Sequence, residues 1–210
     1  MNPHGNPGGP SAPPRRLDPL VALLLPTVIH RLGNATQLIS GLNSMLGFGD
    51  DESLAMVASR SDDLTRAGEK ATRVGYALGV LGSAQGTELL LARREPAGLE
   101  WMLDFLAEGL RREGRELRPL VLPHLAPAAA DGWQPPWAVG RVLLAASLGP
   151  DGAGRWNLEL RPEGWLLTAG EPDGPAWLAL QEDFARKVPA VEVLAGPGAS
   201  VVFPAGWFSA

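Results

Sequence analysis

The chain has 210 residues and a formal charge of −5, and 45% of its residues are hydrophobic. It is long enough to bury a core, and its negative charge argues against nucleic acid or an anionic membrane as its main partner. It contains no cysteine and only three histidines, of which no two have ligand spacing, so we expect neither a disulfide nor a bound metal.

Residues 1–16 are dominated by glycine, proline, asparagine and serine. A segment of this composition cannot bury much apolar surface, so we expect a disordered tail. It has no apolar stretch of the signal-peptide kind, and the longest apolar run, residues 20–29, is about half the length that crosses a bilayer. We therefore expect a cytoplasmic protein with no membrane contact.

A long helix is predicted to begin at the Asp18-Pro19 pair, which supplies an acidic N-cap and a proline suited to the first helical position. Apolar or small residues then recur in steps of four and three, as in a heptad repeat. This spacing predicts a helix that packs in a bundle. The recurring positions are Val21, Leu25, Val28, Leu32, Ala35, Ile39, Leu42 and Leu46.

A second amphipathic helix is predicted over residues 52–83, after the turn GFGDDES. Residues 17–84 would then form an antiparallel helical hairpin. Because a lone hairpin leaves its apolar seam half exposed, we expect a homodimer in which two hairpins form a four-helix bundle.

The pattern changes after residue 84, where short apolar runs alternate with helices. Helices are predicted at 97–114, 135–149 and 175–187, and strands at 87–95, 117–123, 155–163, 164–171, 190–195 and 199–208. This order predicts that residues 85–210 form an α/β sandwich with a helix-covered mixed sheet, which makes the whole chain an α+β protein. We expect packing roles for the tryptophans, which are Trp101, Trp133, Trp137, Trp156, Trp165, Trp177 and Trp207.

The first predicted helix carries the run HRLGNATQLISGL at residues 30–42. This run resembles the phosphoacceptor motif of histidine kinases, in which the histidine is followed by an acidic residue and, four positions later, by asparagine or threonine. His30 and Asn34 match that pattern, while Arg31 replaces the acid. The order of elements is also similar to the kinase core, so the resemblance implies a dimerisation hairpin followed by a Bergerat-type ATPase domain.

Positions that bind the nucleotide in kinases are altered here. Helix 135–149 resembles the kinase helix whose asparagines bind magnesium and phosphates, but it carries Ala145, Ala146 and Gly149. The aspartate and glycine that contact adenine in kinases have only a shifted counterpart here, formed by Glu171, Asp173 and Gly174. We interpret Glu171 and Asp173 as turn residues rather than ligands. The resemblance is thus to histidine phosphotransferases of bacterial phosphorelays, including that of sporulation, which keep a degenerate ATPase-like domain and do not use ATP.

The heptad phase places His30 on the side of the helix that faces away from its bundle partners. A phosphoryl acceptor must be exposed there, because the donor has to approach the imidazole in line with the bond that breaks. Asn34 lies one turn further on the same face and could hydrogen-bond the ring or a phosphoryl oxygen. Arg31 could pair with phosphate or with acidic groups around a receiver's active site, or it could be a solvated surface charge. Gln37, Leu38 and Gly41 continue this face as an expected docking surface.

The sequence therefore favours phosphoryl transfer between His30 and an aspartate of a response-regulator receiver domain, which would bring its own Mg²⁺. Arginine at position 31 cannot act as the base that autophosphorylation uses. Two alternatives stay open, a pseudokinase-like dimeric scaffold without phosphotransfer and an ATP-dependent histidine kinase. For His30 itself, an exposed histidine without a function is the plain alternative.

Overall fold

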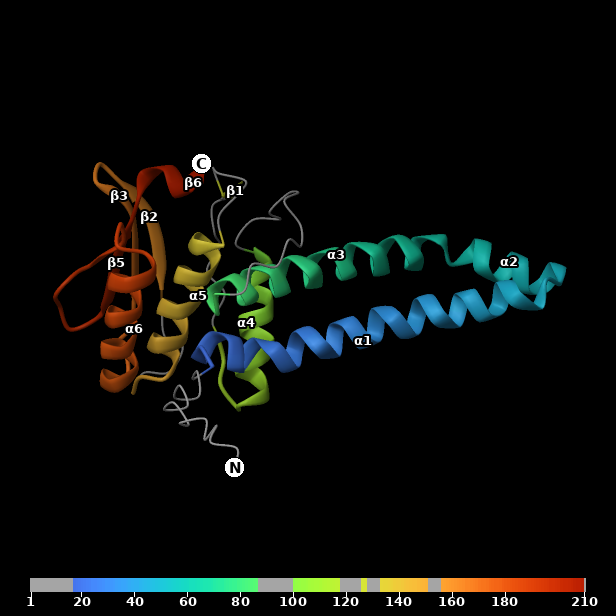
Figure 1. The fold of residues 1–210 in the computed structure, drawn as a ribbon, viewed down its shortest axis with the longest axis horizontal. Coiled ribbons are helices and arrows are strands. Elements are labelled where there is room, and N and C mark those ends of the chain that lie inside the picture. The colour runs from blue at the N-terminus through green and yellow to red at the C-terminus, as the bar shows by residue number, and fades with distance from the viewer. Residues whose placement is uncertain (1–16, 87–99, 118–125, 128–132, 151–155, 210) are drawn as a thin grey trace, which may run out of the picture.

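A computed structural model describes residues 17–86, 100–117, 126–127, 133–150 and 156–209. The described fold is α+β, with a long helical hairpin projecting from a body of helices and a small sheet (Figure 1). The predicted tail at 1–16, the predicted strand at 87–95 and all but the first residue of that at 117–123 lie outside the described residues.

Helix α1 runs from Pro19 to Phe48. It begins where the sequence predicts, because the side chain of Asp18 accepts a hydrogen bond of 2.9 Å from the backbone N–H of Leu20. It ends at Gly49, whose positive φ of 69° is the left-handed conformation that commonly closes a helix.

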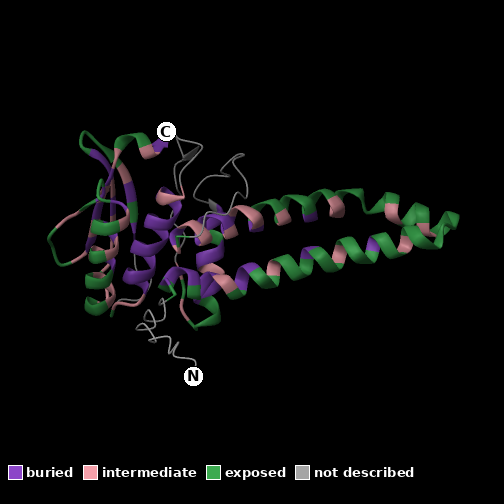
Figure 2. Cartoon of the chain, in the orientation of Figure 1, coloured by how far each residue is buried: buried purple, intermediate pink, exposed green. Residues whose placement is uncertain are grey.

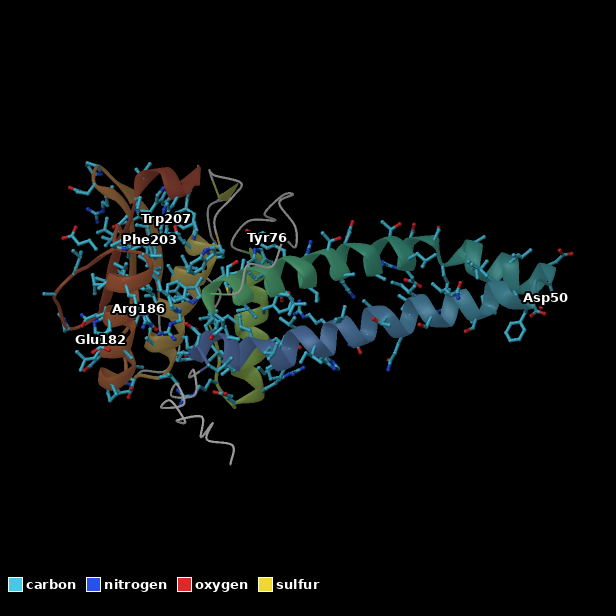
Figure 3. All side chains as sticks on the ribbon, viewed as in Figure 1. Asp50, Tyr76, Glu182, Arg186, Phe203 and Trp207 are labelled. Atoms are coloured by element: carbon cyan, nitrogen blue, oxygen red, sulfur yellow. The ribbon has the colours of Figure 1, made fainter. Side chains whose placement is uncertain are left out.

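The single helix predicted over 52–83 is instead two helices, α2 (Asp51–Ser59) and α3 (Ser61–Ala84). At the break, the Arg60 N–H bonds to the carbonyl of Val57, three residues back, and the Ser59 hydroxyl bonds to the carbonyl of Met56. These local bonds compete with the regular helical pattern. Asp50, labelled at the hairpin tip in Figure 3, caps α2 by accepting from the Ser53 N–H at 2.7 Å, which lowers the pKa of its carboxyl group.

The hairpin packs through every second member of the predicted heptad series. Val21, Val28, Ala35 and Leu42 of α1 are buried, as are Ala67, Val74 and Leu81 of α3, whereas the alternate α1 residues are more open. Leu32, Ile39 and Leu46 are 40%, 44% and 47% exposed. Figure 2 shows that most of the outer part of the hairpin is exposed. One row of each helix thus forms the contact between α1 and α3, and the second α1 row is left open by the described chain.

The body contains helices that the amphipathic patterns predict and a sheet that differs from expectation. Strands β2, β3, β5 and β4 form a four-stranded sheet in that order, and every pairing is antiparallel. The expected mixed sheet is therefore wrong for the described strands, because β2 and β3 form a hairpin and β5 lies between β3 and β4 and runs antiparallel to both. The bounds are α4 Glu100–Arg112, β1 Ala126–Pro127, α5 Gln134–Ser147, β2 Asn157–Arg161, β3 Gly164–Ala169, α6 Gly174–Lys187, β4 Glu192–Val193, β5 Ala199–Phe203, η1 Ala205–Trp207 and β6 Phe208–Ser209.

The strand predicted over 199–208 ends at Phe203, because Pro204 has no N–H to continue the ladder. A turn of 3-10 helix follows, and β6 then pairs with β1. In this turn the Trp207 ring stacks on Phe203 with centroids 5.6 Å apart (Figure 3). The packing role predicted for the tryptophans is confirmed, since four are buried and Trp133, Trp177 and Trp207 are half-buried against the core.

A buried ionic cluster joins the base of the hairpin to the body. The Asp18 side chain, only 1% exposed, accepts a hydrogen bond from the Trp137 indole at 3.3 Å and lies 3.5 Å from both Arg141 and Lys187. Arg141 lies on α5 and Lys187 ends α6. The carboxylate that starts α1 is therefore shared with both helices of the sandwich.

The two cations of this cluster have further partners. Arg141 pairs with Asp183 of α6 at 2.8 Å, and the Lys187 ammonium donates to the carbonyl of Ala84 at 2.8 Å. Ala84 is the last residue of α3, where a cation is favoured by the helix dipole. The cluster thus ties both ends of the hairpin to the body.

Replacing Asp18 by asparagine tests this cluster. The asparagine side chain would still cap α1, but Arg141 and Lys187 would lose a buried counter-charge, so we expect the free energy of unfolding to fall by about 3 kcal/mol. Urea denaturation followed by circular dichroism measures it. Asp50→Asn is the matched control, because Asp50 also caps a helix but is fully exposed. It should lower stability much less than Asp18→Asn does, and equal effects of the two variants would contradict the role of the cluster.

Candidate functional site

His30 lies on α1 with an exposed side chain. Its neighbours Val28 and Ala35 belong to the row that packs on α3, so the helical periodicity turns position 30 away from α3. The exposure agrees with the heptad phase read from the sequence. An incoming group can therefore reach this imidazole from solvent.

Asn34 contacts the histidine directly. The Asn34 side-chain nitrogen Nδ2 is 3.2 Å from His30 Nε2, across one helical turn, and both side chains are exposed. In the tautomer that carries the ring proton on Nδ1, Nε2 accepts this bond from the amide N–H. The bond fixes the ring orientation while leaving the imidazole open to solvent.

Arg31 lies on the neighbouring flank of α1 and contacts α4. Its guanidinium is 2.6 Å from the Asp104 carboxylate, and its Nε donates to Glu108 at 2.7 Å. The same group lies 4.4 Å from the centre of the Phe105 ring. Burial lowers the pKa of Arg31, but the bonds to Asp104 and Glu108 outweigh it and the net pKa is raised. Arg31 is thus neither a solvated charge nor free for phosphate in this structure.

Helix α4 approaches α1 closely beside this ion pair. A Cβ placed on Gly109 would lie 3.1 Å from the Leu23 side chain, so glycine allows the contact. The sequence did not predict Asp104 and Glu108 as site residues, because they lie 73 and 77 residues away from Arg31 along the chain. Their only feature in the sequence is that two acidic residues lie four positions apart on the polar face of a predicted helix. That spacing does not show which distant residue they contact.

The residues predicted to dock a partner continue the His30 side of α1. Gln37 and Gly41 are exposed and Leu38 is half-buried. A Cβ added at Gly41 would meet nothing within 4 Å. No charged residue occurs in the sequence between Arg31 and Asp50, so this part of α1 offers a smooth, uncharged surface.

The residues that the sequence analysis compared with nucleotide-binding positions of kinases lie together at the C-terminal end of α5. Ala145 and Ala146 are buried, and the Ala145 carbonyl accepts a bond of 3.2 Å from the Asp173 N–H. A Cβ on Gly149 would lie 1.9 Å from the Glu171 carbonyl oxygen, so backbone lies directly against this glycine. The turn before α6 therefore packs on the helix end.

Asp173 has a structural role in this turn. Its side chain accepts from the Ala176 N–H at 3.0 Å and caps α6, which begins at Gly174. Glu171 is exposed. The carboxylate nearest to the expected adenine position is thus already engaged by the protein's own backbone.

In the described ranges, no group of three or more histidine, cysteine, aspartate or glutamate side chains has the arrangement of a metal site. Of the helices described, none combines the length and apolar character needed to cross a membrane.

Comparison with known proteins yields no family or relative. No protein-family model, no curated protein and no solved structure matches this chain.

Replacing Arg31 by methionine tests the contact between α1 and α4. We expect a loss of about 1–2 kcal/mol in the free energy of unfolding, because the partly buried carboxylate of Glu108 loses its counter-charge and the exposed Asp104 loses its ion-pair partner. A double-mutant cycle with Glu108→Gln, measured by urea denaturation, should give a coupling near ~1 kcal/mol. The control cycle uses Arg66 and Asp63, which are also 2.6 Å apart but exposed on one helix, and should give almost none. Equal couplings would contradict a structural role for Arg31.

Proposed function

We propose that this protein is a histidine phosphotransferase, which relays a phosphoryl group between His30 and aspartates of receiver domains in the cytoplasm, without using ATP. The observation that carries this proposal is the exposed His30 ring, held by Asn34 at 3.2 Å on an otherwise uncharged helix surface. The corresponding architecture is a dimeric four-helix bundle with a degenerate Bergerat-type domain. The hairpin and the α+β body are compatible with it.

In the proposed reaction, a nitrogen of the neutral His30 ring attacks the phosphorus of an aspartyl phosphate. The N–P bond forms as the bond to the aspartyl oxygen breaks, and that oxygen leaves as a carboxylate. The reverse reaction restores the aspartyl phosphate. The receiver would supply Mg²⁺ for the charge on the transferred group, so this chain needs to provide an oriented, accessible imidazole.

The neighbouring residues have distinct roles in this proposal. Asn34 orients the ring before attack, and its amide can turn to a phosphoryl oxygen once phosphorus occupies the ring nitrogen. Gln37, Leu38 and Gly41 lie further along α1, where small and uncharged side chains would admit a docking helix of the receiver. Arg31 supports the site indirectly, by holding α4 against the helix that carries His30.

The absence of ATP use is supported by the turn before α6. In this turn Asp173 caps a helix, and the Glu171 carbonyl lies against Gly149 at the end of α5. The protein's own backbone thus lies against the helix end that binds phosphates in kinases. An active kinase would have to rearrange both elements.

A second candidate function is favoured by the pairing of Arg31. A phosphoryl acceptor often has a cation nearby, but the guanidinium next to His30 in sequence is engaged by Asp104 and Glu108. A scaffold that binds a signalling partner without accepting phosphate would not need that charge. Phosphotransfer and scaffolding differ in whether His30 is chemically required.

Labelling by phosphorylated receiver domains tests the proposal. The full chain is incubated with a panel of receivers that carry radioactive aspartyl phosphate, and transferred label is followed after electrophoresis. We expect labelling by at least one receiver, near-complete loss of it in His30→Ala, and retention in His124→Ala, which removes a different histidine. The label should be labile in acid and stable in alkali, as a phosphoramidate is.

Three other results would each contradict the proposal in a different way. Receiver binding that persists in His30→Ala, with no labelling of the unchanged protein, would replace phosphotransfer by the scaffold function. Labelling of His30→Ala would contradict the assignment of His30. Binding of Mg-ATP in calorimetry, with His30 labelled from radioactive ATP, would establish the kinase alternative.

A further inference from the structure

Helix α1 has a single permanently charged side chain, and it lies directly beside the proposed phosphoacceptor. Arg31 is the only lysine, arginine, aspartate or glutamate among residues 19–48, and it follows His30 in the sequence. Adjacent side chains of a helix point about 100° apart, so the guanidinium does not cover the imidazole. Its charge still acts over about 10 Å, one Debye length at 0.1 M salt, and such a neighbour lies within that range. Arg31 can therefore act on a phosphoryl group at His30 through its charge.

Two carboxylates of α4 neutralise this charge. Asp104 lies 2.6 Å and Glu108 lies 2.5 Å from the guanidinium nitrogens of Arg31. The other carboxylate oxygen of Glu108 pairs with Arg112 at 3.2 Å. We call these four side chains the Arg31 cluster. Arg31 and Arg112 contribute two positive charges and Asp104 and Glu108 contribute two negative charges, so the cluster has no net charge.

Packing holds the Arg31 cluster in place as well as charge. The Arg31 guanidinium lies 4.4 Å from the centre of the Phe105 ring, which is buried. Further along α4, Gly109 approaches α1 so closely that a Cβ there would lie 3.1 Å from the Leu23 side chain. Only 26% of the Arg31 side chain is exposed. The neutralised Arg31 thus belongs to the contact between two packed helices, unlike an ion pair between exposed side chains, which must be ordered at an entropic cost.

We infer that Asp104 and Glu108 destabilise phosphorylated His30 by neutralising Arg31, so that the protein passes the phosphoryl group on instead of storing it. An unpaired cation beside the phosphorylated ring would stabilise the negative charge on the phosphoryl oxygens. Because that stabilisation is cancelled, the equilibrium of transfer lies further toward the receiver.

The inference rests on the proposed phosphotransfer and gives two residues of α4 a role in it. In the onward step, the N–P bond of phosphorylated His30 breaks as an aspartyl oxygen of the receiver bonds to phosphorus. The imidazole leaves as a neutral group, with its proton on the other ring nitrogen. Asp104 and Glu108 act through Arg31 in this step and are not ligands of the transferred group.

The test measures the transfer equilibrium in variants of the Arg31 cluster. The full chain is mixed with a labelled receiver at about 0.1 M salt, and the forward and reverse transfer rates, followed by rapid quench, give the equilibrium constant. Glu108→Gln and Asp104→Asn each leave one surplus positive charge, so each should shift the equilibrium toward phosphorylated His30 by about threefold. Arg31→Met leaves one surplus negative charge and should shift it toward the receiver by a similar factor.

The opposite signs of these shifts separate charge from packing. Arg31→Met and Glu108→Gln break the same ion pair, so a purely structural effect would move the equilibrium in the same direction in both variants. The double variant restores a net charge of zero and should return the equilibrium constant close to that of the unchanged protein. At about 1 M salt, where the Debye length is about 3 Å, the shifts should disappear.

Two further variants support the comparison. Asp63→Asn is the matched control, because it breaks an ion pair of the same 2.6 Å length on α3, outside the Arg31 cluster, and should leave the equilibrium constant unchanged. Asp104→Asn keeps the test decisive if Glu108→Gln weakens folding, because the Asp104 side chain is 57% exposed. Circular dichroism checks that each variant keeps its helices.

The inference is wrong if Arg31→Met and Glu108→Gln shift the equilibrium in the same direction, if neither shifts it, or if the shifts persist at high salt. These results would leave phosphotransfer itself intact, because His30 would still be labelled. Failure of every receiver to label the unchanged protein would instead overturn phosphotransfer, and this inference with it.

Discussion

The buried carboxylate of Asp18 is the constraint on which the arrangement of hairpin and body depends. It caps the first turn of α1 and also faces Arg141 and Lys187 of the sandwich helices. A buried charge must keep its partners, because an unpaired one is costly. Lys187 adds the carbonyl of Ala84, so both hairpin helices are fixed at the same place. The direction in which the hairpin projects is therefore set at its base.

The part of the hairpin near this base packs against other elements, whereas the part far from it has few buried residues. His30 lies about three turns beyond Asp18, between the buried residues Val28 and Ala35 and beside the contact of Arg31 with α4. That segment combines an exposed side chain with a helix that packs on α3 and is held by α4, as a positioned reactive group requires. Beyond Leu42 the outer hairpin buries nothing of its own until Ala67. The candidate site thus lies in the supported part of α1, whereas the tip of the hairpin has little packing of its own.

The different sides of α1 have different roles. One side packs on α3, the flank with Arg31 contacts α4, and the flank with Leu32 and Ile39 stays open. His30 and Asn34 point to the remaining side. Because a helix presents successive residues about 100° apart, neighbours such as His30 and Arg31 can serve unrelated functions. Arg31 is accordingly connected with the fold through its contacts with α4.

The sequence by itself determined the features that depend on local periodicity. The start at Asp18, the exposed phase of His30 and the helices around Trp101, Trp137 and Phe184 follow from spacing within one element. Only the tertiary structure decided what depends on residues distant in sequence. It paired Arg31 with Asp104 and Glu108, joined Asp18 to Lys187 and made the described sheet antiparallel. Periodicity identifies which face of a helix is buried, but it cannot identify the distant side chain that the face meets.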